Sequence, residues 1–391
     1  MPTSTRSLWP STDTGALDPI SAMQWRKQRL VETGRPIIDL GIGDPREPTP
    51  PFVREALVRA VRPVSHSPRR DGLPELRTAI ARWISRRFDV ELDPETQILP
   101  LLGTKEFAFS LSQTLPGPGG TVMVTSPGYP IPAMGARAAG ARVHTLALQE
   151  ANAYLPDLDR VDRSEWERAD LLWLNYPNNP TGALAPRSFL EAAAERCRRS
   201  GTVLAADEAY SEFWFGRESP ASALQVGDLT GVLVTNTLSK RSCMTGYRSG
   251  FVAGDPNLIA PLAQRAFDAG VTPLEPVQQA SIAAWNDEAH VANHRALCAA
   301  KRRLFQKVLM RRGLRAAGSE GGLYLWVQTP DGYASLDWSL ELLDRAGLVV
   351  TPGSAFGPEG EGFVRIAMVA TLGNCRRAAG KLDEALEETR G

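Results

Sequence analysis

The sequence has little lysine, cysteine or histidine. Lysine supplies only six of the 44 basic residues, and four cysteines and four histidines are spread over 391 residues. The cysteines form no Cys-x-x-Cys pair, which argues against a disulfide framework and a thiolate metal site. His290 and His294 lie four residues apart, on one face of any helix there, but the pair lacks the further ligands of a zinc site. We therefore expect no metal.

Net charge and long hydrophobic runs are also missing. Basic and acidic residues both total 44, so no overall charge favours nucleic acid or an anionic membrane. No apolar run approaches the ~20 residues of a membrane-spanning helix. The polar N-terminal residues contain no apolar core of a secretion signal. We therefore expect a cytoplasmic protein without nucleic-acid or membrane partners.

Short apolar runs alternate with helical patterns through the middle of the chain. The runs typical of buried strands are Thr121–Thr125, Leu171–Leu174, Val203–Ala206, Val232–Thr235 and Gly250–Ala253. Stretches between them, such as residues 187–199, place apolar side chains at helical spacing. This alternation predicts an α/β fold with a mostly parallel sheet and helices on both faces.

The pattern changes near residue 275, where one long helix or two joined helices are followed by strands and a further helix. We therefore expect three parts. Residues 1–49 would form an N-terminal arm and part of a small domain, residues 50–275 a large domain, and residues 276–391 a small α+β domain.

Polar residues gather where the middle strands end. Gly103 and Thr104 precede a helical pattern, and a helix N-terminus suits a phosphate group. Asn175–Gly182 follows a buried strand, at the sheet edge where open α/β folds bind ligands, although such a loop can also be a simple turn. Asp207 ends another buried strand and therefore needs a cationic partner.

Lys240 stands beside hydroxyl residues and shortly before Arg248. A phosphate cradle, a buried carboxylate and a lysine together suit pyridoxal 5'-phosphate (PLP), which binds a lysine as a Schiff base and pairs its ring nitrogen with an acid. Arginine could not replace this lysine, because arginine stays protonated and forms no imine.

The chain resembles the fold-type-I PLP-dependent transferases, specifically the class I/II aminotransferases. The motifs that carry this resemblance are IDLGIGDPREPTPP, DGLPELRTAIARW, NNPTG, DEAY, SKRSCMTGYRSGFVAGD, GLYLWV and VTPGSAFGPEGEGFVRIAM. The SKRS and FVRIAMVATLGNC stretches are most similar to the succinyl-diaminopimelate aminotransferase branch. The resemblance implies a large domain with a mostly parallel seven-stranded sheet, and a homodimer with shared active sites.

The resemblance also implies a role for individual residues. Lys240 would bind PLP as a Schiff base and later move the proton at the substrate Cα, and Asp207 would pair with the ring nitrogen. Asn179 and Tyr210 would hydrogen-bond the ring hydroxyl oxygen, with Tyr210 counted among the catalytic residues. Tyr129 would stack on the ring, although a tyrosine there can also be a packed core residue.

Two further groups follow from the same resemblance. The groups that would hold the phosphate are the backbone of Gly103, Thr104 and Lys105 and the side chains of Thr237, Ser239 and Arg248. Arg365 would hold the substrate α-carboxylate through its planar fork, next to Asn179. Gly43 would allow the backbone to approach that carboxylate.

The chain departs from the family pattern at two places. Ser67 stands where the family usually has a tyrosine that reaches the partner subunit's cofactor phosphate. This change removes a hydrogen bond of ~1–3 kcal/mol and leaves space, unless Arg69 or His66 takes over. Arg46 follows a motif near the substrate entrance and could meet a distal carboxylate, or it could be a solvated loop residue.

Three functions fit these observations. The first is an aminotransferase for an amino acid with a long or acidic side chain, with glutamate as donor and a 2-oxo acid as product. The second is a PLP-dependent lyase, decarboxylase, cyclase or oxidase of specialised metabolism. The third is a ligand-sensing regulator, which we disfavour because no basic helical DNA-binding segment precedes the fold.

Overall fold

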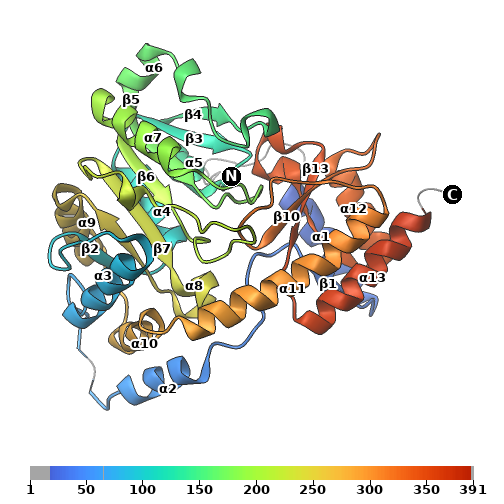
Figure 1. The fold of residues 1–391 in the computed structure, drawn as a ribbon, viewed down its shortest axis with the longest axis horizontal. Helices are drawn as coiled ribbons and strands as arrows, with labels where there is room; N and C mark the ends of the chain where they lie inside the picture. The colour runs from blue at the N-terminus through green and yellow to red at the C-terminus, as the bar shows by residue number, and fades with distance from the viewer. Residues whose placement is uncertain (1–17, 65, 389–391) are drawn as a thin grey trace, which may run out of the picture.

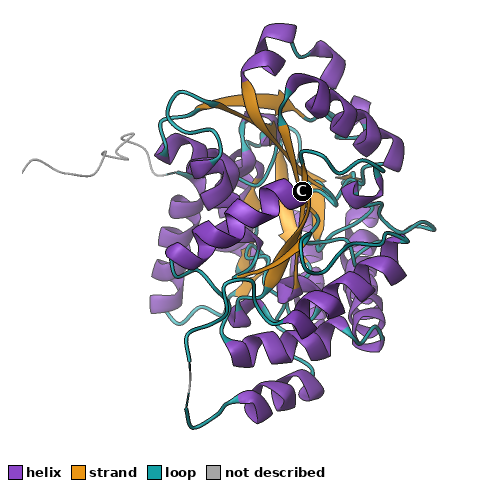
Figure 2. Ribbon diagram, turned by 90° about the vertical axis from the view of Figure 1, so that its left-hand side faces the viewer, coloured by secondary structure: helices purple, strands orange, loops and turns teal. Residues whose placement is uncertain are grey.

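The computed structural model describes residues 18–64 and 66–388 of the chain. The arm expected in the first residues lies outside the described part. A large sheet and a smaller sheet lie side by side, and helices surround both (Figures 1 and 2). No helix of the described residues has the length and apolar character needed to cross a membrane.

The large sheet has seven strands in the order β2-β8-β7-β6-β5-β3-β4. Its strands are β2 (Ile98–Leu101), β3 (Thr121–Ser126), β4 (Arg142–Ala147), β5 (Ala169–Asn175), β6 (Val203–Asp207), β7 (Val232–Thr237) and β8 (Gly250–Gly254). Only β8 runs antiparallel to its neighbours β2 and β7, and the other pairs are parallel. The predicted mostly parallel seven-stranded sheet is therefore confirmed.

Helices cover both faces of this sheet. The helices around it are α3 (Pro74–Phe88), α4 (Thr104–Thr114), α5 (Ile131–Ala138), α6 (Arg163–Arg168), α7 (Arg187–Ser200), α8 (Leu238–Arg241), α9 (Pro256–Asp268) and α10 (Glu275–Trp285). Helix α2 (Pro51–Ala60) lies apart from the sheet and packs on α10 (Figure 1). On β5, Leu172 and Leu174 belong to the hydrophobic core with α3 and α7, whereas Leu171 and Trp173 belong to the core with α4 and α5. The two-sided burial explains why these strands read as continuous apolar runs.

The smaller sheet is antiparallel and four-stranded, in the order β12-β13-β10-β9. Its strands are β9 (Ala316–Ala317), β10 (Tyr324–Gln328), β12 (Thr351–Pro352) and β13 (Phe363–Ala367), and β1 (Ile38–Asp39) pairs in parallel with β11 (Leu348–Val349). The helices of this part are α1 (Pro19–Glu32), α11 (Ala289–Arg311), α12 (Ser335–Ala346) and α13 (Leu372–Glu388). Helix α11 runs from beside α8 to the smaller sheet (Figure 1).

Candidate active site

The carboxyl ends of the central parallel strands meet at one cavity. Asn175, Asp207 and Thr237 are the last residues of β5, β6 and β7, and Asn175 is in register with Asp207. A cavity of about 550 Å³ opens beside them. The predicted site residues that line it are Gly43, Thr104, Lys105, Tyr129, Asn179, Asp207, Tyr210, Thr237, Ser239, Lys240, Arg248 and Arg365. The predicted residue Gly103 is not part of this lining, but the Arg248 guanidinium packs against it.

One end of the cavity is built as an anion cradle. Helix α4 begins after Gly103, whose φ of 91° favours glycine, and no side chain caps the helix N-terminus. A Cβ at Gly103 would come within 2.9 Å of Arg248 Nη2, so a larger residue would displace that guanidinium. The buried hydroxyls of Thr237 and Ser239 lie 2.9 Å apart nearby. Free N–H groups, an arginine and two hydroxyls form a donor set that suits a phosphate.

Asp207 is a buried carboxylate at the base of the cavity. The backbone N–H of Ala209 donates to its Oδ1 at 3.1 Å. Burial raises the pKa of Asp207 to about 6, and the nearby Thr235 hydroxyl and Lys240 ammonium only partly oppose this effect. A cationic ring nitrogen in the cavity would therefore relieve the cost of this buried charge.

Lys240 lies on the short helix α8, whose N-terminus is capped by Thr237 through the N–H of Ser239 at 3.1 Å. Its Nζ donates to Asp44 Oδ1 at 2.7 Å. Asp44 is half-exposed and lines the same cavity. Sequence reasoning selected Gly43 and missed Asp44, although Asp44 stands next to Gly43 in the LGIGDP motif.

Two tyrosines share a hydrogen bond at the cavity wall. The hydroxyls of Tyr210 and Tyr324 lie 2.6 Å apart, and burial raises the pKa of Tyr210. Tyr324 begins β10 in the GLYLWV motif, and sequence reasoning gave it no role. The same residue explains Gly43, because a Cβ there would collide with the Tyr324 hydroxyl. Burial also raises the pKa of Tyr129, which lines the cavity between the two sheets.

Arg365 links the smaller sheet to the large one. From β13, its Nη1 donates to Asn179 Oδ1 at 2.7 Å, and its Nη2 donates to the carbonyl of Gly41. The guanidinium also lies 4.2 Å from the Tyr324 ring centroid. Its buried Nε has no hydrogen-bond partner among the described residues, which leaves a donor for a carboxylate ligand.

The residues that departed from the family pattern lie outside the cavity. Ser67 is exposed in the segment between α2 and α3. That Arg69 or His66 takes over the role of the family's tyrosine stays a prediction. Arg46 is exposed and does not line the cavity, whereas Glu47 forms an ion pair of 2.5 Å with the fully buried Lys301 of α11. Glu47 therefore ties the N-terminal segment to α11.

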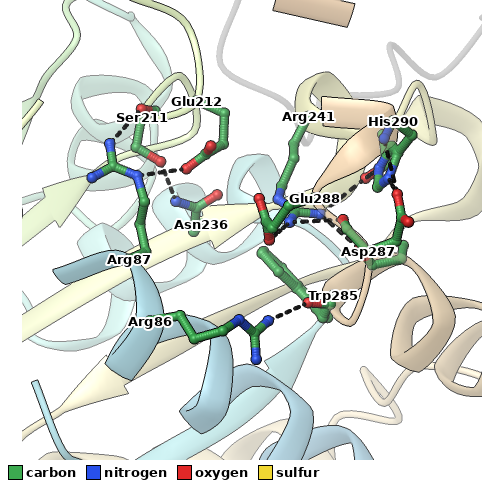
Figure 3. A network of polar contacts seen from close by, with 12 residues as sticks. Arg86, Arg87, Ser211, Glu212, Asn236, Arg241, Trp285, Asp287, Glu288 and His290 are labelled. Carbon is green, nitrogen blue, oxygen red and sulfur yellow. Dashed lines mark hydrogen bonds and ion pairs between the residues drawn. The ribbon is translucent and has the colours of Figure 1, made fainter. Parts of the chain in front are cut away.

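A polar network anchors the helix that carries Lys240 (Figure 3). Arg241 is fully buried, with its guanidinium 4.8 Å from the Trp285 ring centroid. It donates to the carbonyl of Ala284 at 2.8 Å and pairs with Glu288. The hydroxyl of Ser242 lies 2.8 Å from His290 Nε2. These contacts fix the Lys240 segment to the junction of α10 and α11.

A lysine, a buried aspartate and an anion cradle at the carboxyl edge of an α/β sheet define a class of lysine-dependent cofactor enzymes. The chain belongs to the aminotransferase class I and II family, whose family model matches residues 35–382. It is therefore an aminotransferase, and the predicted recognition, fold class and enzyme class are confirmed. Membership of this family implies PLP, and the donors described above fit the phosphate and ring nitrogen of that cofactor.

Curated relatives cover nearly the whole chain. The LL-diaminopimelate aminotransferase of Aquifex aeolicus is 37% identical over 361 residues, which span 91% of this chain and 93% of that protein. The LL-diaminopimelate aminotransferase of Oleidesulfovibrio alaskensis is 37% identical over 367 residues, spanning 93% and 92%.

Solved structures have the same fold. Substrate-bound BacF from Bacillus subtilis aligns with a TM-score of 0.88 at 32% identity, covering 94% of this chain and 95% of that one. A probable N-succinyldiaminopimelate aminotransferase from Thermus thermophilus aligns with a TM-score of 0.87 at 30% identity, covering 94% and 100%. The second match agrees with the branch that the sequence motifs resemble.

Proposed function

We propose that this aminotransferase binds PLP through Lys240 and accepts an amino acid with a long side chain. The observation that carries the proposal is the convergence of Lys240, Asp207 and the Gly103–Arg248 cradle on one cavity. Each group alone is common in proteins, but the three together match the aldehyde, ring nitrogen and phosphate of a single cofactor.

The bound cofactor would supply an aldehyde that joins an amine and a ring that withdraws electrons from the substrate Cα. Lys240 Nζ would hold the cofactor and, once substrate replaces it, take and return the proton at Cα. Asp207 would keep the ring nitrogen protonated. Asn179 and Tyr210 would hydrogen-bond the ring hydroxyl, and Arg365 would orient the substrate through its α-carboxylate.

The curated relatives support a substrate with a long side chain, because both are named for LL-diaminopimelate. Asp44 gives the cavity a half-exposed carboxylate once Lys240 turns to the cofactor, and it would suit a second ammonium group on the substrate. Glutamate is the proposed donor. The relatives do not favour a lyase, decarboxylase, cyclase or oxidase.

The homodimer is also a proposal. Fold-type-I enzymes build their sites between two subunits, and large aliphatic side chains are exposed along and after α2. They are Val58, Val61 and Val64, each more than half exposed. Apolar side chains exposed in this number in one region are typical of a protein–protein contact.

Borohydride trapping and amino-donor spectra test the proposed function. Borohydride should fix PLP to the peptide that contains Lys240, and glutamate should convert the aldehyde absorbance to that of the amine form and release 2-oxoglutarate. Lys240→Ala should abolish both signals. Lys105→Ala is the matched control: Lys105 lines the same cavity, but only its backbone is proposed to hold the phosphate, so the variant should retain both signals.

Two outcomes would count against the proposal. Fixation of PLP to another lysine would remove Lys240 from its role. A spectrum unchanged by glutamate and by LL-diaminopimelate would reject the proposed substrates, while trapping at Lys240 would still support the cofactor assignment.

A further inference from the structure

A second, larger cavity lies away from the active site. It has a volume of about 1220 Å³ and lies between residues 214–221 and helix α11. Residues 184–187 and Glu320 complete its walls. None of its lining residues lines the active-site cavity, so the proposed catalysis does not account for it.

The lining of this groove is strongly cationic. It contains five arginines and two glutamates, in a chain whose charges balance overall. The arginines are Arg187, Arg217, Arg295, Arg302 and Arg303. Three of them, Arg217, Arg302 and Arg303, have no carboxylate within 4.0 Å in the described part of the chain. The groove therefore concentrates positive charge that the protein itself does not neutralise.

Arg302 carries an unsatisfied donor in the wall of the groove. Its guanidinium lies 5.0 Å from the Phe215 ring centroid, and the Gln306 amide, with its oxygen toward Arg302, accepts from Nη2 and Nε at 3.1 and 3.2 Å. The buried Nη1 has no partner among the described residues. Burial lowers the pKa of Arg302 to about 10, and Glu320 only partly opposes this shift. A half-buried cation with a buried free donor gains from an anionic ligand.

The loop that forms one wall is held at both ends. Trp214 stacks under Arg295 at 3.6 Å, and the N–H of Phe215 donates to the carbonyl of Glu320 at 3.0 Å. At the far end, Arg87 donates to the carbonyl of Pro220 at 3.4 Å. A wall fixed in this way is arranged before any ligand binds, which lowers the entropic cost of binding.

We propose that this groove is a binding site for a small polyanion that carries phosphate or carboxylate groups. Arginine forks form paired hydrogen bonds with both groups, and Arg302 and Arg303 would supply them from one face of α11. The aromatic faces of Trp214 and Phe215 keep the neighbouring guanidinium groups in place. The site is separate from the cofactor phosphate cradle.

Calorimetric titration tests this site in protein saturated with PLP, so that the cofactor phosphate fills the cradle of the active site. Sodium pyrophosphate and sodium citrate are titrated separately at constant ionic strength. At least one of them should bind with one-to-one stoichiometry, and the better ligand identifies the phosphate or the carboxylate class. Arg302→Gln and the exposed Arg303→Gln should each weaken binding about tenfold or more.

Arg163→Gln is the control, because it removes the same charge from an exposed ion pair with Glu167 on α6. Its binding constant should stay within about twofold of the unaltered protein. Arg303→Gln replaces an exposed side chain, so it tests the site even if Arg302→Gln fails to fold. The absence of saturable binding for both probes, or equal binding by all three variants, overturns the proposal.

Discussion

At the scale of single residues, Asp207 illustrates how a buried carboxylate in a binding site can lower the stability of the fold. Burial raises its pKa from 3.8 to about 6. The folded state therefore binds the proton more tightly than the unfolded state. The stabilisation from this proton is complete below about pH 4 and is lost as the pH rises through about 6.

Asp207→Asn removes this titration. Without cofactor, we expect the variant to unfold like the unaltered protein at pH 4 and to be more stable at pH 8 by about 2 kcal/mol. Denaturant unfolding of the cofactor-free proteins at the two pH values measures the difference. Burial raises the pKa of the neighbouring Glu208 to about 8, and this group is present in both proteins. The charge of Asp207 is the smallest of the causes that act on Glu208, so the titration of Glu208 changes little between the two proteins. An equal difference at both pH values would contradict the expectation.

Sequence motifs predicted many residues that line the cavity, but they did not predict Asp44, whose partner is distant along the chain. Lys240 and Asp207 stand in motifs that signal their chemistry. The partner of Lys240, Asp44, lies 196 residues away along the chain, and Glu47 meets Lys301 across 254 residues. Such pairings depend on how α8 and α11 pack, which no local pattern records.

At the scale of elements, α8 has four residues and cannot be stable alone, so its contacts decide where Lys240 lies. Arg241→Met should lower the free energy of unfolding by about 1–3 kcal/mol, because the Ala284 carbonyl and Glu288 lose a buried donor. It should also weaken PLP retention, measured by absorbance during dialysis.

Arg199→Met provides the comparison, since Arg199 is exposed and paired with Glu195 on the surface of α7. That change should alter stability by less than about 0.5 kcal/mol and leave PLP retention unchanged. Equal effects of both substitutions would show that the network of Figure 3 does not position α8.

The five central strands were predictable because their side chains are buried on both faces. Strands β2 and β4 were not among the predicted strands. On β4 only Leu146 is buried, and β2 contains Pro100, which is unusual in a strand interior. The predicted single or joined helix after residue 275 proved to be α10 and α11, which residues 286–288 separate.

At the scale of the whole molecule, the exposed valines of α2 and the following segment test the homodimer. Val58 and Val61 are 70% and 64% exposed in the single chain. Replacing both with aspartate should convert a dimer to a monomer and reduce activity, because charge in an apolar contact is costly. Gel filtration with light scattering measures the mass.

Met310→Asp is the control, because Met310 is 79% exposed on α11. It should leave the dimer intact. A fully active monomer of the unaltered protein would reject the shared-site arrangement, and dissociation by Met310→Asp would place the contact elsewhere.

The architecture could be predicted from the order of the motifs. The cationic groove could not be predicted from the sequence. Its arginines come from α7, the loop after Phe213 and α11, and arginine is so frequent in this chain that none of them stands out. The division into domains at residues 49 and 275 stays a prediction.

The bond from Asn179 to Arg365 has a mechanical consequence. It joins the smaller sheet to the loop after β5 at the point where a carboxylate would bind, so the protein's own contacts fix the position of Arg365. Substrate binding would then cost little free energy for ordering this arginine. All amino acids carry the α-carboxylate that Arg365 would bind. Selectivity among them would therefore have to come from the contacts of the substrate side chain.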